Sequence, residues 1–179
     1  MEPVVVAAVP DGIRLERHRD LEGRDWHPWV TRALLALIAA LLVLALFNVF
    51  GQRPLTSRAA DAQAVLSVYS PTRVRGGLLY TARFHVSARS DLKKVSLLLD
   101  PGWVEGMQIN SINPQPVDEA SNDGRLYLDL GHIPAGHSAI YFIEFQVNPT
   151  NVGHRSQNVE LDNNGKRLLF IKRTITIYP

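Results

Sequence analysis

Three histidines are the residues whose types and spacing could bind a metal ion. His132 and His137 lie five positions apart in one predicted loop, and His154 lies in a later one, with Asp129 just upstream of the first loop. Imidazole and carboxylate groups are zinc ligands, and a zinc site needs three or four of them in tetrahedral geometry. The spacing here matches no established zinc signature. We therefore interpret the three histidines as polar turn residues and expect no metal ion or other cofactor.

Residues for covalent or acid–base chemistry are also sparse. Ser138 follows His137 directly, but no Gly-x-Ser-x-Gly elbow surrounds it and no oxyanion donor is identifiable. Asp118, Glu119 and Asp123 form an acidic group whose spacing fits no EF-hand calcium loop. The sequence has no cysteine, no phosphate-binding Gly-rich motif and no dinucleotide fingerprint. We find no catalytic constellation in it and expect a protein that is not an enzyme.

The region that carries these residues, 64–179, has the alternation of a β-rich domain. Apolar residues recur at every second position in short segments that end at Pro, Gly or Asn, with no helical periodicity between them. The segments are 64–69, 78–86, 95–99, 107–112, 126–130, 138–147, 156–161 and 167–178, the last two joined around Asn163-Asn164-Gly165. We predict a mainly β fold, an immunoglobulin-like antiparallel β-sandwich of about seven strands.

An apolar run over 33–50 precedes the β-rich region. It reads ALLALIAALLVLALFNVF, without a charge and with Asn48 as its one polar residue. Together with the residues just before it, the run is about 20 residues long, the length that a helix needs to cross a bilayer core of ~30 Å. A leader of 32 residues and the length of the run favour a retained anchor over a cleaved signal peptide.

Arginines near the two ends of this helix predict its orientation. Five of them lie in the 32 residues before it, whereas only Arg53 and Arg58 lie within a similar distance after it. Because basic residues concentrate on the cytoplasmic side, we expect the N-terminus in the cytoplasm and the C-terminal domain outside the cell membrane. The predicted parts are a cytoplasmic tail over 1–32, a transmembrane helix over 33–50, a stalk over 51–63 and an extracytoplasmic sandwich over 64–179.

Two stretches of the β-rich region resemble a family of bacterial surface modules. The first contains Gly77-Leu78-Leu79-Tyr80-Thr81, then the segment 92–99 and Asp100-Pro101-Gly102-Trp103; the second is 130–138, which leads into the long strand. Over residues 65–162 the chain is similar to the immunoglobulin-like conserved-repeat domain of unknown function of envelope proteins. This resemblance implies a sandwich fold with an adhesive or spacer role and brings no catalytic residues. A single copy behind an anchor favours a compact subunit close to the membrane.

Trp103 and Met107 are the candidate contact residues. They follow a Pro-Gly turn, where Trp103 either forms an exposed apolar patch with Met107 or plugs one end of the sandwich; burial is the commoner state of tryptophan. The basic residues Lys166, Arg167, Lys172 and Arg173 lie on the last strand pair. We interpret them as charges that protect a solvated edge strand.

The charge balance excludes one class of partner and leaves two functions open. With 19 basic and 17 acidic residues, the chain lacks the basic excess of a nucleic-acid-binding protein. We expect the lipid bilayer and a membrane or envelope protein as partners. The first hypothesis is a single-pass accessory or protein-interaction subunit of a membrane or envelope assembly. The alternative is a membrane-anchored sensor whose outer loops bind a ligand or a metal ion.

Overall fold

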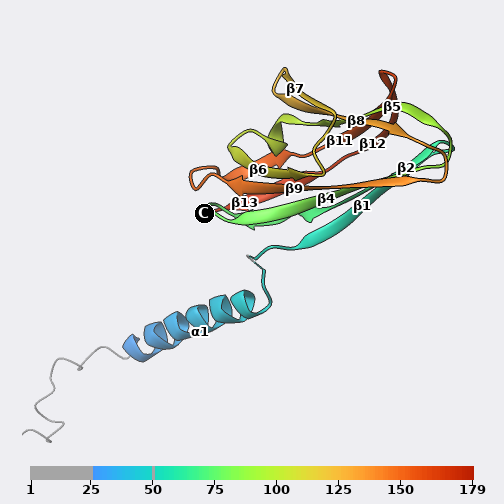
Figure 1. Ribbon diagram of the computed structural model, residues 1–179. Helices are drawn as coiled ribbons and strands as arrows, with labels where there is room; N and C mark the ends of the chain where they lie inside the picture. The colour runs from blue at the N-terminus through green and yellow to red at the C-terminus, as the bar shows by residue number, and fades with distance from the viewer. Residues whose placement is uncertain (1–25, 50) are drawn as a thin grey trace, which may run out of the picture. The chain divides into compact units, whose positions relative to one another are not determined.

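The computed structural model describes residues 26–49 and 51–179. These residues fall into two units, and the division lies between Phe47 and Asn48. The helix belongs to the first unit and the described strands belong to the second (Figure 1). The predicted cytoplasmic tail lies outside the described residues as far as residue 25.

Helix α1, His27–Leu46, is 20 residues long. Alanine and leucine make up most of it, and both are strong helix formers. Pro28 stands in the first turn, where its missing N–H group costs no helical hydrogen bond. The helix ends before Asn48, whose φ of 52° lies in the left-handed region that terminates helices. The helix therefore begins and ends earlier than the predicted segment 33–50.

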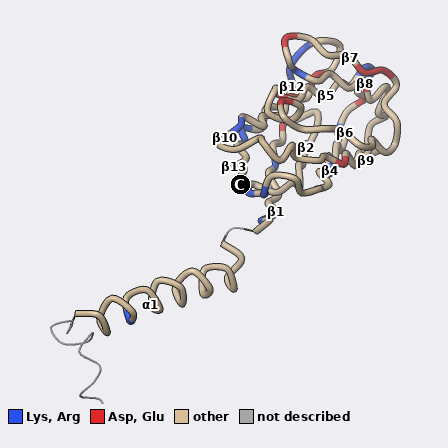
Figure 2. Tube along the Cα trace, turned by 90° about the vertical axis from the view of Figure 1, so that its left-hand side faces the viewer, with Lys and Arg blue, Asp and Glu red and all other residues tan. Residues whose placement is uncertain are grey.

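The surface of α1 is apolar on every side. None of its residues is buried, and Arg32 is its only Lys, Arg, Asp or Glu, visible as the one blue segment of the helix in Figure 2. The Arg32 guanidinium carbon lies 5.2 Å from the centroid of the Trp29 ring. The helix is long and apolar enough to cross a membrane, a property that membrane anchors share with signal sequences.

The second unit is built from three sheets. Sheet I has the antiparallel order β1 (Pro54–Ala60), β2 (Ala64–Pro71), β4 (Leu79–Ala88), β9 (Ser138–Val147) and β6 (Met107–Asn113). Sheet II has the antiparallel order β12 (Lys166–Ile171), β11 (Val159–Asn163), β5 (Leu92–Leu99), β8 (Arg125–Ile133) and β7 (Asp118–Asn122). Sheet III is small and joins β10 (Gly153–Ser156), β13 (Thr174–Tyr178) and β3 (Arg73–Arg75), the last two in parallel. The predicted mainly β, sandwich-like class is confirmed.

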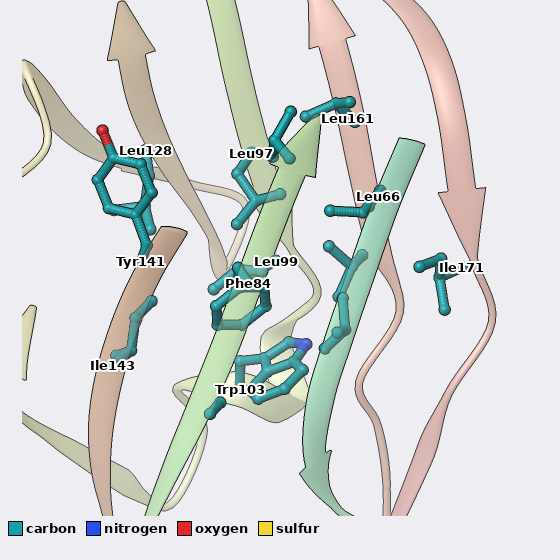
Figure 3. Packing of buried hydrophobic residues seen from close by; sticks show 14 of the residues in the cluster. Leu66, Phe84, Leu97, Leu99, Trp103, Leu128, Tyr141, Ile143, Leu161 and Ile171 are labelled. Carbon is teal, nitrogen blue, oxygen red and sulfur yellow. The ribbon is translucent and has the colours of Figure 1, made fainter. Parts of the chain in front are cut away.

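Sheets I and II enclose the hydrophobic core. Alternate residues of each strand point inward, as in β4, where Phe84 is fully buried while its neighbour Arg83 is exposed. Figure 3 shows side chains of the two sheets facing one another, with Leu66 and Ile143 from sheet I and Leu97 from sheet II. Burying a large apolar side chain stabilises a domain by ~1.5–3 kcal/mol, so this core can support the fold without cross-links.

Trp103 lies inside this core, at the end of the short 3₁₀ turn η4 (Pro101–Trp103). Its indole Nε1 donates to the Asn158 carbonyl at 3.2 Å. Its ring centroid lies 5.3 Å from that of Phe84 and 5.4 Å from that of Phe145. Figure 3 shows the Trp103 side chain next to Phe84. The exposed contact patch considered for Trp103 is therefore wrong, and the plugging alternative is right, because the turn carries the ring inward and the Asn158 carbonyl accepts a hydrogen bond from its N–H group.

The predicted stalk over 51–63 is also wrong, because most of it is strand β1. All seven residues of β1 pair with β2, from Pro54 opposite Pro71 to Ala60 opposite Val65. The Asp61 carboxylate closes the hairpin by accepting hydrogen bonds from the backbone N–H groups of residues 63 and 64. An edge strand with no buried side chain does not need apolar alternation, so its sequence carries no strand signal.

The predicted last strand, 167–178, is broken at Arg173. Strands β11 and β12 form the expected hairpin around Asn164 and Gly165, which both have positive φ. The chain then leaves sheet II, and β13 joins sheet III. Arg173 at this break is buried, with 5% of its surface exposed, so its assignment as a solvated edge charge is wrong.

Candidate functional site

The three predicted histidines each contact a different partner. His132, on β8, has its Nε2 2.7 Å from an Asp91 carboxylate oxygen. The His137 ring contacts the Ala135 carbonyl at 3.3 Å, and the His154 ring contacts the Thr176 hydroxyl at 3.0 Å. Within residues 26–49 and 51–179, no three His, Asp or Glu side chains converge as metal ligands do.

Met107 contacts the core rather than a surface patch. The Tyr80 hydroxyl donates to the Met107 sulfur at 3.2 Å and accepts a hydrogen bond from the Gln157 side-chain amide at 3.0 Å. Burial raises the pKa of the Tyr80 hydroxyl far above its usual value, against the opposing effects of Gln157 and the Arg173 charge. Tyr80 therefore stays protonated and links β6 of its own sheet to the segment between β10 and β11.

Arg173 forms a buried hydrogen-bond cluster next to Tyr80. Its Nη1 donates to the Ser57 hydroxyl at 2.7 Å and to the carbonyls of Leu55 and Val68, at 3.4 and 3.2 Å. Its Nη2 donates to the Ser70 carbonyl at 2.9 Å. Burial lowers the pKa of this guanidinium. One side chain thereby joins β1 to β2 and to the start of β13.

The outer face of sheet I, which points away from the core, carries exposed aromatic side chains next to an arginine. Tyr69, Arg83 and Phe142 are direct cross-strand neighbours on β2, β4 and β9. Tyr69 is 38% exposed and Phe142 is 43% exposed. The Arg83 guanidinium carbon lies 5.3 Å from the centroid of the Tyr69 ring. Ile140, also exposed, extends this row along β9.

A pocket of about 500 Å³ lies at the β1 end of the same face. We name it the Arg58 pocket. The register sets Arg58, Ser67 and His85 side by side on β1, β2 and β4. Thr56, Ser87 and Arg89 complete its polar lining. Two guanidinium groups, one imidazole and three hydroxyl groups thus surround one cavity.

The arginines of this face lack acidic partners. In the described part of the chain, no carboxylate forms an ion pair with Arg58, Arg83 or Arg89. Glu144 is the one acidic residue among the outward positions of sheet I, and its carboxylate accepts a 3.4 Å hydrogen bond from Ser111. The outer face of sheet I therefore combines unpaired positive charge with exposed aromatic surface.

The residues of this face were not predicted as a site from the sequence. Each belongs to the polar half of an alternating strand, where arginine and histidine are ordinary solvent-facing residues. The one available signal is that Tyr69 and Phe142 are aromatic, although each stands on the side of its strand that alternation predicts to face water. Only the register of β1, β2, β4 and β9 makes these positions neighbours.

Comparisons with known proteins identify no family. No family model matches the sequence, and no curated protein matches it. Among solved structures, AvmM, which catalyses macrocyclization in alchivemycin A biosynthesis, has a TM-score of 0.47 and 8% identity, covering 71% of this chain and 97% of its own. A non-cellulosomal cohesin from the archaeon Archaeoglobus fulgidus has a TM-score of 0.39 and 12% identity, covering 59% and 84%.

The chitin-binding domain of a chitinase from Pyrococcus furiosus is a third similar structure. Its TM-score is 0.35 at 7% identity, covering 66% of this chain and 98% of that domain. These TM-scores all lie below 0.5, so the likenesses carry no argument about function.

Proposed function

We propose that this chain is a single-pass membrane protein that displays a β-sandwich outside the cell membrane and binds a protein partner there. The contact surface is the outer face of sheet I. The observation that carries the proposal is the row formed by Tyr69, Arg83 and Phe142, in which exposed aromatic rings flank an arginine without an acidic partner. The role is binding rather than catalysis.

The properties of α1 support the anchor. At 1.5 Å per residue, its 20 residues span about 30 Å, which matches the apolar core of a bilayer. Its leucines are exposed on every side, and the contact of so much apolar surface with water is unfavourable. Trp29 and Phe47 lie near its two ends, as aromatic residues do at the headgroup level. The arginine excess before the helix supports a cytoplasmic N-terminus.

The chemistry of the face defines the partner. Aromatic residues and arginine dominate the energy of protein interfaces, because they combine apolar area with directed hydrogen bonds. An arginine without an acidic partner forms its strongest contact with a carboxylate. The partner is therefore a membrane or envelope protein that presents carboxylates between apolar side chains.

Anchoring makes a modest contact sufficient. Two proteins held in one membrane meet at a raised effective concentration, so the binding face does not need high intrinsic affinity. The sandwich-like sheets support kinship with immunoglobulin-like envelope modules. One sandwich behind one helix departs from the repeated arrays of those modules and favours a compact subunit. The chain would thus act as an accessory subunit of a membrane or envelope assembly.

Site-specific photo-crosslinking in the native host tests the contact face. A photoreactive amino acid replaces Phe142 on sheet I or Phe170 on sheet II, two phenylalanines with 43% and 44% exposure. We expect a defined crosslinked protein from position 142, none from position 170, and loss of the product in an Arg83→Glu background. Equal crosslinking from both positions, or none from position 142, overturns the proposal.

Membrane insertion and topology have their own test. We expect the full chain to remain in the membrane fraction after an alkaline carbonate wash. We also expect protease added outside intact spheroplasts to degrade the sandwich. A chain released by the wash, or a sandwich protected until lysis, contradicts the proposed arrangement.

A further inference from the structure

We propose that the Arg58 pocket is a binding site for a phosphate group, distinct from the row of residues that contacts the protein partner. The pocket is open to solvent on the outer face of sheet I, at the β1–β2–β4 end. Its polar lining consists entirely of groups that donate hydrogen bonds to an anion: two arginines, one histidine and three hydroxyl side chains.

The backbone holds these donors in place. Arg58, Ser67 and His85 are consecutive cross-strand neighbours in an antiparallel sheet, and Thr56 and Ser87 are the next outward residues on β1 and β4. Arg89 follows β4, and its Nη1 donates to the Asp61 carbonyl at 2.7 Å. The backbone N–H of Arg89 also donates to the Gln63 carbonyl at 2.8 Å. These contacts fix Arg89 against the β1–β2 turn while leaving its other N–H groups available.

The charge around the pocket favours an anion. No carboxylate lines it. The acidic residues nearest in sequence to its lining are Asp91 and Asp61. Asp91 Oδ1 lies 2.7 Å from His132 Nε2, and Asp61 Oδ1 accepts hydrogen bonds from the backbone N–H groups of residues 63 and 64. Among the described residues, the Arg58 side chain has no hydrogen-bond partner, and neither the Arg58 nor the Arg89 guanidinium has an ion-pair partner. Two neighbouring guanidinium groups in this state repel each other and attract a multiply charged oxyanion.

Phosphate fits this donor set best. Its oxygens accept several hydrogen bonds at once, and the guanidinium fork matches their spacing. A volume of about 500 Å³ exceeds the needs of an isolated phosphate ion and lies in the range of small-molecule sites. The pocket therefore accommodates a phosphate ester, with room for the group that carries it. Both a phospholipid headgroup and a water-soluble phosphate ester supply this chemistry.

Binding of inorganic phosphate to the full-length chain in a neutral detergent tests the site. The measurements are calorimetric titration and the thermal midpoint, with chloride at matched ionic strength as the reference. We expect Arg58→Gln to weaken phosphate binding about tenfold or more, because it removes a charge-assisted contact. Arg89→Gln should do the same, and Arg58→Gln alone suffices if the Arg89 variant fails to fold.

Arg83→Gln is the matched control, since it removes the same charge from the same face but lies outside the pocket lining. We expect it to leave phosphate binding unchanged while abolishing the crosslink at position 142; Arg58→Gln should do the reverse. The two proposals therefore fail separately. Phosphate binding no stronger than the effect of chloride, or equal weakening by Arg83→Gln and Arg58→Gln, overturns the phosphate site.

Reconstitution in nanodiscs distinguishes the two sources of phosphate. If a lipid headgroup fills the pocket, discs that contain phosphatidylglycerol should abolish binding of added glycerol phosphate, whereas phosphatidylcholine discs should not. If the ligand is a soluble phosphate ester, binding should persist in both kinds of disc. In phosphatidylcholine discs, where both cases leave binding intact, loss of binding in the Arg58→Gln variant supports the site itself.

Discussion

The outer faces of sheets I and II carry arginines in opposite electrostatic settings. On sheet II, Arg125 Nη2 lies 3.0 Å from a Glu160 carboxylate oxygen, and its Nε lies 3.4 Å from an Asp100 oxygen, as an ion pair without hydrogen-bond geometry. Arg167 also contacts Glu160, at 3.8 Å. On the described sheet I, Arg58, Arg83 and Arg89 have no such partner. Figure 2 shows residues of both signs beside one another around β5, β8 and β12.

This difference separates charges that support the fold from charges available to a ligand. Ion pairs on the surface contribute little to stability. Their opposite charges neutralise each other, so they attract other charged molecules only weakly. Unpaired arginines beside exposed aromatic rings keep their hydrogen-bonding capacity for another molecule. Phe142 and Phe170 have similar exposure, yet Phe170 lies under Arg167, 5.8 Å from its guanidinium carbon, within the paired network of sheet II. Both faces carry arginine and phenylalanine. The binding face is therefore distinguished by the lack of acidic partners for its arginines and not by its residue types.

The largest predicted effect concerns Arg173, whose guanidinium group donates hydrogen bonds to β1 and β2. Replacing Arg173 with Met leaves the acceptors on β1 and β2 without their donor, and each buried unsatisfied group costs about 1–3 kcal/mol. We expect the free energy of unfolding to fall by about 3 kcal/mol or more, measured by denaturant titration of the full chain in detergent. Because β1 forms one wall of the Arg58 pocket, phosphate binding should be lost as well.

Arg173→Lys is the companion variant. It keeps the charge but cannot reach all of the acceptors with one ammonium group. We expect an intermediate loss of stability. A Met variant as stable as the wild type would show that Arg173 does not hold β1 in the sheet.

The second prediction concerns alkaline pH and the tyrosines on the inner face of sheet I. Burial raises the pKa of Tyr80, and burial together with the Asp129 charge raises the pKa of Tyr141. The pKa of each tyrosine is therefore higher in the folded state than in the unfolded state. The contribution of the neutral hydroxyl to stability is complete below the unfolded-state pKa and is lost as the pH rises from there through the folded-state pKa. We expect stability to decline by about 1 kcal/mol for each pH unit above about pH 10.

Tyr80→Phe should flatten this decline, although it lowers stability at neutral pH by removing the hydrogen bonds to Gln157 and Met107. Tyr69→Phe, on the exposed side of the same sheet, is the control. Unfolding curves between pH 8 and pH 11 provide the measurement, and equal slopes for wild type and Tyr80→Phe would refute the account.

The third prediction compares the two faces directly. Arg125→Gln breaks the contacts with Asp100 and Glu160, so we expect a loss of about 1 kcal/mol in the free energy of unfolding. Arg83→Gln removes only a contact with an exposed ring, and we expect a change within about 0.5 kcal/mol. Equal costs for the two variants would remove the distinction between a structural face and a binding face.

The smallest predicted effect is a gain in stability on sheet II. Burial and the Glu160 charge raise the pKa of Asp162, although Arg125 and Arg167 oppose this, and its Oδ1 has no hydrogen-bond partner within the described residues. Because the pKa of Asp162 is raised in the folded state, its ionisation destabilises the fold once the pH exceeds the usual pKa of an aspartate. Asp162→Asn should raise the free energy of unfolding by about 0.5 kcal/mol at neutral pH, after allowance for solvent screening.

This gain should disappear in acid, where Asp162 is protonated in both states. Thermal unfolding at pH 7 and at pH 3 measures the difference. A variant that is less stable than the wild type at pH 7 would mean that the Asp162 carboxylate forms a favourable contact.

The local pattern of the sequence was sufficient where one side of an element is buried. The strand predicted over 138–147 matches β9 at both ends, and the turn at Asn163-Asn164-Gly165 joins the expected hairpin. Alternation of apolar and polar residues specifies such strands, because a shift by one position would expose the whole apolar set. The same reasoning failed for β1, whose side chains are not buried, and at Arg173, which only long-range hydrogen bonds account for.

The sequence by itself determined the apolar helix near the front of the chain, the mainly β class of the rest and the inner side of most strands, because each depends on the periodicity of neighbouring residues. The tertiary structure alone decided that Trp103 is buried, that β1 belongs to the sandwich and that Arg58, Ser67 and His85 line one pocket. These features depend on contacts between residues far apart in the chain. Strand register creates such contacts, and the residue pattern of a single strand does not specify which strand pairs with it.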